Sequence, residues 1–318
     1  AISLLREQTN NPYLKFVLRK IYEELKEGGT LSVSLEKYPN IFPGIYIALV
    51  RAGENTGNLA EVLFRITDYR KREEEFLSRV RMSLVYPVFM AVLGIITVIF
   101  MFIFVIPRLT QIFLSMQETL PLPTRILISL SGFFRRGTVF VLFLIFMGII
   151  FLRRELKRNL KLGFSYSKFK LNLPIFGRFL LKAELSRFCR ALAILIKNGI
   201  PIIKAMELAV PTLNNELLKE EIKKSISALV QGGSFGRTLK ESKHIPLFMS
   251  NLISIGEEAG ELDLALLEIA EVYEQDTYET MQAFTNLLEP LLILVLGLVI
   301  GFIVIAMLLP IFQMSALK

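Results

Sequence analysis

The side chains best suited to proton transfer or nucleophilic attack are the only histidine and the only cysteine of the chain, His244 and Cys189. Ser-His-Asp or Cys-His catalysis would need His244 as its base. His244 lies in a Lys-His-Ile-Pro turn beside a predicted helix start, so we interpret it as a surface or capping residue. Cys189 lies among apolar residues and is interpreted as a core residue. A single cysteine also excludes an internal disulfide and a Cys/His metal cluster.

Paired carboxylates and phosphate-binding loops are the remaining signals of catalysis. Glu220–Glu221 and Glu257–Glu258 are adjacent acidic pairs, which we interpret as solvated helix ends. The sequence contains no G-x-x-x-x-G-K-[ST] loop, so any ATP hydrolysis that its function requires would have to come from another chain. We therefore predict that the protein is not an enzyme and uses no cofactor.

Long uncharged runs predict the membrane-spanning helices of the chain, which would position the polar residues described above. Hydrophobic residues make up 53% of the 318 residues and are concentrated in three stretches, for which we predict transmembrane helices at 84–106, 126–152 and 287–310. The first has no charged residue. The second is less regular, because its apolar part, Gly137–Leu152, is short and flanked by arginines that can snorkel to the interface. A buried or interfacial helix is the alternative for that segment.

The basic residues indicate an orientation. The formal net charge is +8, and Lys and Arg cluster beside the apolar runs, which favours a membrane flank over a nucleic-acid groove. The loop from Pro107 to Thr124 has one basic residue, Arg108. The positive-inside rule therefore places the helical domains 1–83 and 153–286 in the cytoplasm. The loop 107–125 and the tail 311–318 then lie on the outer side of the membrane.

The chain contains an internal repeat. Around Gly53 the two copies match at an offset of 203, and upstream of Leu35 they match at 204. Within the membrane runs, Pro87 and Pro107 match Pro290 and Pro310. The segment Arg187–Lys204 has no counterpart before Ala1. We infer that the first unit is truncated at its N-terminus, with natural loss of that helix as the alternative.

The second unit is predicted to contain six helices. The first has an apolar helical pattern up to a stop at Gly199, and the next begins after Pro201. Asn214 or Asn215 caps the third, Ser234 caps a short fourth that ends near Lys240, and Pro246 opens a fifth that ends at Gly256. The sixth begins near Glu261 and continues into the membrane. The fold class is therefore all-α, as two tandem six-helix bundles, the first incomplete, with three transmembrane helices.

The most distinctive motif, Gly-Glu-x-x-Gly-x-Leu, occurs once in each unit. It comprises Gly53, Glu54 and Gly57, and then Gly256, Glu257 and Gly260. We predict a turn between helices, in which the first glycine is a C-terminal cap and the second provides positive φ or close approach. The alternative is that Glu54 and Glu257 also mark a contact surface.

At these residues the sequence resembles the inner-membrane platform proteins of type II secretion and type IV pilus systems, the F-protein family. The resemblance rests on the duplicated corner, on Tyr86-Pro87 and Val105-Ile106-Pro107, on Leu120-Pro121-Leu122-Pro123-Thr124, and on the Phe188–Pro201 segment. It covers almost the whole chain. Two departures are the absent first opening helix and Glu289-Pro290 in place of Tyr86-Pro87.

The resemblance implies a non-enzymatic scaffold that couples a hexameric assembly ATPase to extraction of pilin or pseudopilin subunits and to filament assembly. It also implies contacts with other inner-membrane assembly proteins and the bilayer, and self-association. Our candidate contact residues are Glu54, Arg70, Lys71, Arg72, Glu257 and Glu258. The basic run at 70–72 corresponds, in the second unit, to a mostly acidic run near 273–279, so the two domains differ in charge at equivalent positions. We therefore hypothesise unequal roles for the two domains.

The main alternative is a small transporter or channel component. Such proteins place ionisable residues inside the membrane, where they are costly and functional. The predicted spans have none in their centres, and the nearest is Glu289, at the edge of the third. A structural role for Glu289 and a contact with a partner's charge are both open. The uncharged spans favour a scaffold.

Overall fold

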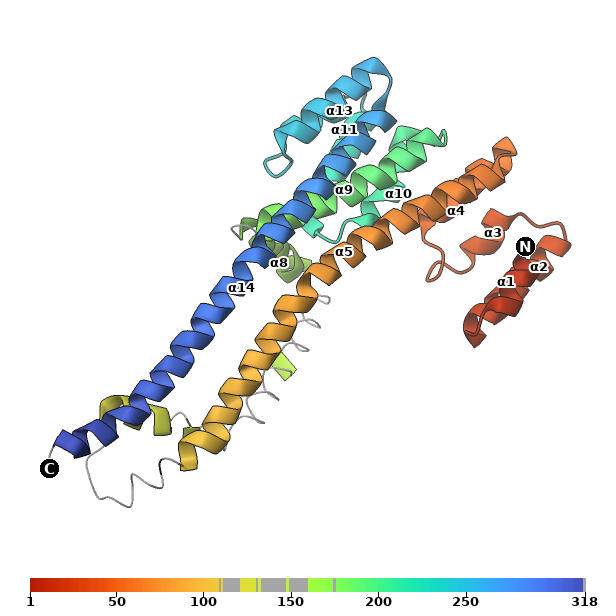
Figure 1. Ribbon diagram of the computed structural model, residues 1–318. Helices are drawn as coiled ribbons and strands as arrows, with labels where there is room; N and C mark the ends of the chain where they lie inside the picture. The colour runs from red at the N-terminus through yellow and green to blue at the C-terminus, as the bar shows by residue number, and fades with distance from the viewer. Residues whose placement is uncertain are drawn as a thin grey trace. The chain divides into compact units, whose positions relative to one another are not determined.

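The computed structural model describes residues 1–108, 110, 121–129, 131–132, 147–148, 160–173 and 176–316 (Figure 1). All regular structure in these ranges is helical. The chain divides into two units. Unit 1 comprises Ala1–Leu77 with Phe164–Tyr278, and unit 2 comprises Ser78–Gly163 with Glu279–Lys318. Helices α5 and α14 continue from one unit into the other.

The second repeat follows the predicted helices closely. Gly199, with φ +78°, ends its first helix, and the side chains of Asn215 and Ser234 accept hydrogen bonds at the two predicted caps. The fifth helix was predicted to end at Gly256, but it continues to Ala259. The elements are α9 (Phe176–Lys197), α10 (Ile202–Ala209), the 3₁₀ turn η2 (Val210–Thr212), α11 (Glu216–Val230), α12 (Phe235–Lys240), α13 (Leu247–Ala259) and α14 (Leu262–Ala316).

The first repeat contains the counterparts of α10 to α14. Asn11 caps its second helix by accepting from the amides of Tyr13 and Leu14, as Asn215 does from Leu217 and Leu218. The duplication inferred from the sequence thus extends to individual hydrogen bonds. The elements are α1 (Ile2–Gln8), α2 (Pro12–Lys26), α3 (Leu31–Glu36), α4 (Gly44–Thr56) and α5 (Leu59–Phe100).

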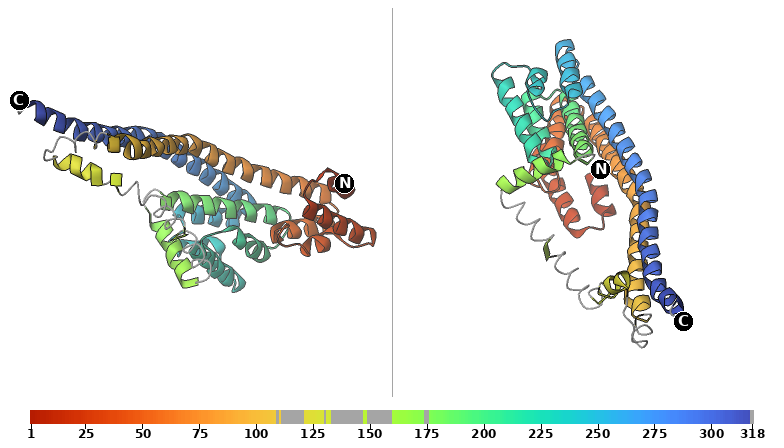
Figure 2. Two further views of the ribbon diagram at one scale, coloured as in Figure 1. Left: turned by 90° about the horizontal axis from the view of Figure 1, so that it is seen from below. Right: turned by 90° about the vertical axis from the view of Figure 1, so that its left-hand side faces the viewer.

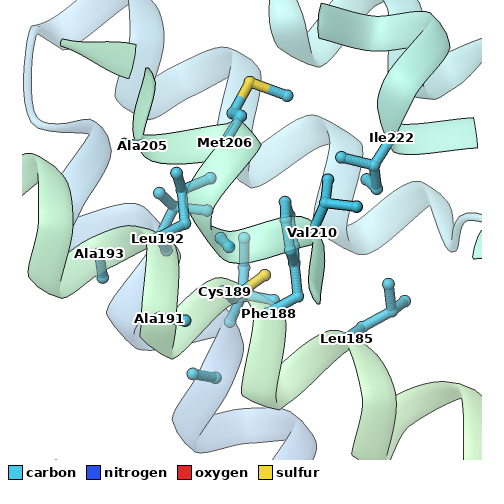
Figure 3. Packing of buried hydrophobic residues seen from close by; sticks show 14 of the residues in the cluster. Leu185, Phe188, Cys189, Ala191, Leu192, Ala193, Ala205, Met206, Val210 and Ile222 are labelled. Carbon is cyan, nitrogen blue, oxygen red and sulfur yellow. The ribbon is translucent and has the colours of Figure 1, made fainter. Parts of the chain in front are cut away.

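Helix α9 is the centre of the main hydrophobic core in unit 1. Phe188, Cys189, Leu192 and Leu195 are all 0% exposed and belong to one cluster with side chains from α10, α11, α13 and α14. Figure 3 shows part of this cluster, with Phe188, Cys189 and Leu192 of α9 and Met206 of α10 labelled. The spacing of the α9 residues places them on one helical face, as the apolar pattern predicted. Burial of Cys189 confirms it as a core residue.

The first repeat has a smaller core of its own, built from Val17, Ile21, Leu35, Ile47 and Val50. Other side chains of α4 and α5 belong instead to the cluster around α9: Ile45, Leu49, Val62 and Tyr69. The helical parts of the two repeats therefore lie within one unit and share a core. Their division into two separate six-helix bundles stays a prediction.

The two repeats differ at the face that α9 covers. Ala209 and Leu266 are fully buried in the second repeat, whereas the equivalent Leu5 and Leu63 are 53% and 42% exposed. The difference arises because the second repeat packs this face against α9.

Unit 2 contains the apolar ends of α5 and α14, which lie side by side in both views of Figure 2. Helix α5 includes Pro87 and continues as a π-helix, η1 (Met101–Val105), while α14 runs unbroken past Pro290 and Pro310. The stretches Leu59–Arg108 and Leu262–Leu309 are long and apolar enough to cross a membrane. Only 17% of the most apolar window of each is buried.

A short helical segment after Pro121 packs on this pair. Ser131 donates its hydroxyl to the carbonyl of Phe102 at 2.7 Å, and Thr124 donates to the carbonyl of Ala306 at 2.5 Å. Leu127 is 2% exposed and packs between the helices. Apart from 126–129, 131–132 and 147–148, the predicted second span at 126–152 lies outside the described residues.

Candidate functional site: the repeated corners and the paired long helices

Glu54, in the first corner motif, caps the short helix α3. Its carboxylate accepts hydrogen bonds from the amide of Leu31 at 2.5 Å and from that of Ser32 at 3.2 Å. These amides belong to the first turn of α3 and have no partner within the helix. A negative charge at this position also interacts favourably with the helix dipole.

Glu257 forms the same arrangement in the second corner. It accepts from the amides of Phe235 at 2.9 Å and Gly236 at 3.1 Å, and from the hydroxyl of Ser234 at 2.7 Å. Residues 234–236 are the repeat equivalents of 30–32. Both glutamates therefore join the corner to a short helix some 20 residues earlier, which supports the structural interpretation of the motif. Their predicted role in partner contact stays a proposal.

The two glycines of each motif have different structural roles. Gly57 and Gly260 have φ of +73° and +72° and cap α4 and α13 in the left-handed conformation. A Cβ atom on Gly53 would lie 2.9 Å from Val62, and one on Gly256 would lie 2.5 Å from Ala265. The prediction that the first glycine is a C-terminal cap was wrong, because the helix continues for one more turn and that glycine allows close packing instead.

The predicted basic contact residues lie on α5. Arg70 forms ion pairs with Glu73 at 2.8 Å and Glu74 at 3.3 Å, and Arg72 pairs with Asp68 at 3.0 Å. Lys71 is exposed and has no ion pair among the described residues.

The acidic candidate Glu258, next to the capping Glu257, is exposed at the end of α13. Of the six candidates, Lys71 and Glu258 are therefore the most available to a partner.

The ring of His244 contacts the carboxylate of Glu221. This contact was not predicted from the sequence. Its Nδ1 lies 2.7 Å from Oε1 of Glu221, and the hydroxyl of Ser242 donates to the other carboxylate oxygen. Glu221 lies inside α11 with its side chain 14% exposed, so interpreting it as a solvated helix end was wrong. The carboxylate joins the loop before α13 to α11.

Two further charged residues of α9 were missed. Arg190 donates both from Nε to Glu274 at 2.7 Å and from Nη2 at 2.8 Å, and thereby links α9 to α14. Glu184 is 2% exposed and accepts from the amides of Asn214 at 2.5 Å and Asn215 at 3.4 Å. For Glu184, a charged residue beside the apolar stripe of the predicted helix was an available signal. Arg190 lies on the opposite side of that stripe, so the apolar pattern gave no signal for it.

Helices α5, α9 and α14 together enclose a groove of about 480 Å³ in unit 1. Phe64, Ile194 and Leu267 contribute apolar lining, and Phe64 and Leu267 are repeat equivalents. Four basic and four acidic side chains line its edges: Arg65, Arg72, Arg190, Lys197, Glu61, Asp68, Asp263 and Glu271. The balance of charge gives the groove no preference for a charged ligand of either sign.

In unit 2 the long helices meet at residues that correspond in the two repeats. Tyr86 donates its hydroxyl to Oε1 of Glu289 at 3.1 Å. Farther along, a Cβ on Gly94 would lie 2.8 Å from the methyl groups of Leu296, so the helices approach closely there. Glu289 thus has a partner within the chain.

The fold and these contacts define a duplicated all-helical protein with two long apolar helices. The family described as "Type II secretion system (T2SS), protein F" matches residues 1–107 and 188–310, which correspond to the two repeats. The chain belongs to this family.

Named relatives come from both secretion and pilus systems. The chain is 32% identical over 314 residues to the type IV pilus assembly protein PilC of Thermus thermophilus, covering 98% of this chain and 77% of that protein. It is 30% identical over 317 residues to the type II secretion system protein F of Pseudomonas aeruginosa, covering 100% and 78%. With PilC of Pseudomonas aeruginosa it shares 29% identity over 317 residues, covering 99% and 84%.

Proposed function

We propose that this protein is an inner-membrane platform of a type II secretion or type IV pilus machine. In this proposal the helical parts of both repeats face the cytoplasm, and the apolar helices cross the membrane. Family membership and relatives named for both systems support a component of such a machine. The low burial of the apolar stretches supports lipid contact, because a soluble core helix would be covered by protein.

The observation that carries the proposal is the continuity of α5 and α14. They comprise 42 and 55 residues and continue from unit 1 into the apolar stretches of unit 2 without an interruption. At about 1.5 Å per residue, helices of these lengths contain roughly 60–80 Å of helical backbone. We propose that this continuity allows a force applied to unit 1 to reach the apolar ends. We propose that a hexameric assembly ATPase applies that force and that pilin or pseudopilin subunits respond to it in the membrane.

Within unit 1, the ion pair between Arg190 and Glu274 and the core around α9 would hold α5 and α14 together. We propose Lys71 and Glu258 as contacts for the ATPase, because both are exposed. Glu54 and Glu257 would act indirectly, by fixing the corners that orient α5 and α14. Arg70 and Arg72 would contribute to the same ATPase contact, through the surface of α5 on which they form ion pairs. Self-association and contacts with other inner-membrane assembly proteins belong to the same proposal.

We also propose that the protein is not an enzyme. His244 pairs with Glu221 through Nδ1, and the nearby hydroxyl of Ser242 donates to Glu221 rather than to His244, unlike the nucleophile of a catalytic triad. Burial raises the pKa of the Cys189 thiol, which disfavours its reactive thiolate form. Among the described residues, no group of His, Cys, Asp and Glu is arranged to hold a metal ion.

Reconstitution with the assembly ATPase of the same organism tests the proposal. The protein in lipid nanodiscs should bind the hexamer and change its rate of ATP turnover. Lys71→Glu should weaken binding, whereas Lys15→Glu, at an exposed site on α2, should not. Absence of both binding and a turnover effect with a folded sample would contradict the proposal.

A further inference from the structure

Helix α8, Leu160–Asn172, has an apolar stripe that faces away from the helical core. Its inner side is fixed by two residues one turn apart. The carbonyl of Ser167 accepts from Nδ2 of Asn215 at 3.2 Å, and Leu171 packs against the main core. Ser167 is 7% exposed. These contacts define which side of α8 faces the protein.

The opposite side has apolar residues at helical spacing. Leu162, Tyr166, Phe169 and Leu173 follow the spacing i, i+4, i+7 and i+11, which places these positions on one stripe. Among them, Phe169 is 62% exposed, Tyr166 is 38% exposed and Leu173 is 37% exposed. The side chains of Tyr166, Phe169 and Leu173 thus lie open on the side of α8 away from Ser167 and Leu171.

Two lysines lie outside the stripe, one on each side of it. At about 100° per residue, Lys170 lies roughly 40° beyond Tyr166, at the edge of the stripe, and Lys168 lies roughly 100° beyond Phe169, on the polar side of the helix. The ammonium of Lys170 lies 4.3 Å from the centre of the Tyr166 ring, a cation–π contact. An apolar stripe that carries aromatic rings, with lysines at its edge and on the polar side, is the pattern of a helix that lies in a membrane interface, where the rings enter the lipid and the lysines snorkel to the headgroups.

The charge around α8 favours an anionic surface. Residues 156–183 contain seven Lys or Arg and no Asp or Glu. Basic segments of this kind are attracted to anionic lipids. The segment also follows the apolar run that ends at Leu152. We infer that α8 is an interfacial helix, which docks the second repeat on the anionic headgroups of the bilayer through Tyr166, Phe169 and Leu173.

This inference rests on the proposed membrane location but not on the ATPase. The test uses the full chain in nanodiscs with an environment-sensitive fluorophore on a single introduced cysteine. Cys189 is fully buried, so the unsubstituted chain should label poorly and serves as the background control. The probe site is Phe169→Cys. Val230→Cys, which is 65% exposed on α11, is the matched aqueous control, and Leu298→Cys, which is 66% exposed in α14, is the membrane control.

Nitroxide-labelled lipids should quench the probe at 169 when the nanodisc contains phosphatidylglycerol, and much less in phosphatidylcholine alone. The double variant Lys168→Gln/Lys170→Gln should shift the docking equilibrium toward the aqueous state by about fivefold per lysine. The probe at 298 should be quenched in every lipid, and the probe at 230 in none.

An unquenched probe at 169 beside a quenched probe at 298 would overturn the inference and leave the proposed function intact. Shielding of 169 from aqueous iodide without quenching by nitroxide lipid would mean that protein covers the stripe, which also overturns it. If the probe at 298 were unquenched, the proposed membrane location would fail as well.

Discussion

Tyr86 and Glu289 occupy the same position in the two repeats and are hydrogen-bonded to each other, with 3.1 Å between the phenol and carboxylate oxygens. A residue that contacts its own equivalent marks a local two-fold relationship between α5 and α14. Two glutamates here would repel each other. The departure of the second repeat from Tyr-Pro to Glu-Pro therefore turns equivalent positions into a donor and an acceptor.

The first prediction concerns this pair. Tyr86→Phe removes the donor, and Glu289→Gln removes the charge of the acceptor. Each should lower the thermal midpoint of the protein in nanodiscs, and the double variant should lose less than the sum of the two. Strict additivity in the double-mutant cycle would contradict a direct interaction.

The second prediction concerns the corner glutamates. Glu257→Ala leaves the amides of Phe235 and Gly236 without their acceptor and should cost about 2 kcal/mol of unfolding free energy. Chemical denaturation measures this cost. The neighbouring Glu258→Ala is the matched control and should change stability by less than about 0.5 kcal/mol, because Glu258 is exposed. Equal effects of the two variants would refute the capping role.

The third prediction compares two glycines at equivalent positions. Gly94→Ala would place a methyl group 2.8 Å from Leu296, so that side chain must move, whereas Gly297 has no atom within 4 Å of its Cβ position. Gly94→Ala should reduce thermal stability in lipid, by about 1 kcal/mol if Leu296 adjusts. Gly297→Ala should be neutral within the pair α5–α14. A larger loss of stability for Gly297→Ala than for Gly94→Ala would show that α5 and α14 approach each other at a different position.

The fourth prediction concerns the link between α9 and α14. Arg190→Leu leaves Glu274 unpaired and should cost about 2 kcal/mol. This is less than the about 3–5 kcal/mol of a fully buried pair, because the Glu274 side chain is 26% exposed. Arg51→Leu, which breaks the exposed pair with Glu36, should cost less than about 1 kcal/mol by the same denaturation measurement. A small effect of Arg190→Leu would show that the core alone holds α9.

The fifth prediction concerns Cys189. Burial raises the pKa of its thiol, so a thiol reagent should not label the folded protein at pH 8. Labelling should appear together with unfolding, as followed by circular dichroism. Rapid stoichiometric labelling of the folded protein would contradict the position of Cys189 in the core.

Local signals predicted much of the fold. Gly199, Asn215 and Ser234 act through residues no more than a few positions away, so helix ends at these residues could be inferred from the sequence. The internal repeat also supported the prediction of the two long helices. The same residues recur at one offset in both copies, which chance would not produce.

The candidate site was less predictable, because its contacts join distant segments. Glu257 caps a helix 21 to 23 residues earlier, and His244 meets Glu221 across 23 positions. Gly53 was interpreted as a cap, because a glycine before a turn looks the same whether it ends a helix or admits Val62. Only the packing of α4 on α5 distinguishes the two roles.

The central claim is that continuous helices transmit the work of the ATPase to the membrane, and Ser78 tests it most directly. Ser78 is exposed in the middle of α5, at the boundary between the two units. Ser78→Pro removes a helical hydrogen bond and kinks the helix at a cost of about 3 kcal/mol or more, whereas Ser78→Ala preserves it. Filament assembly or secretion would be measured in cells with equal membrane levels of each variant. We predict that Ser78→Pro still binds the ATPase but loses assembly, while Ser78→Ala retains both. Normal assembly by Ser78→Pro would contradict the account.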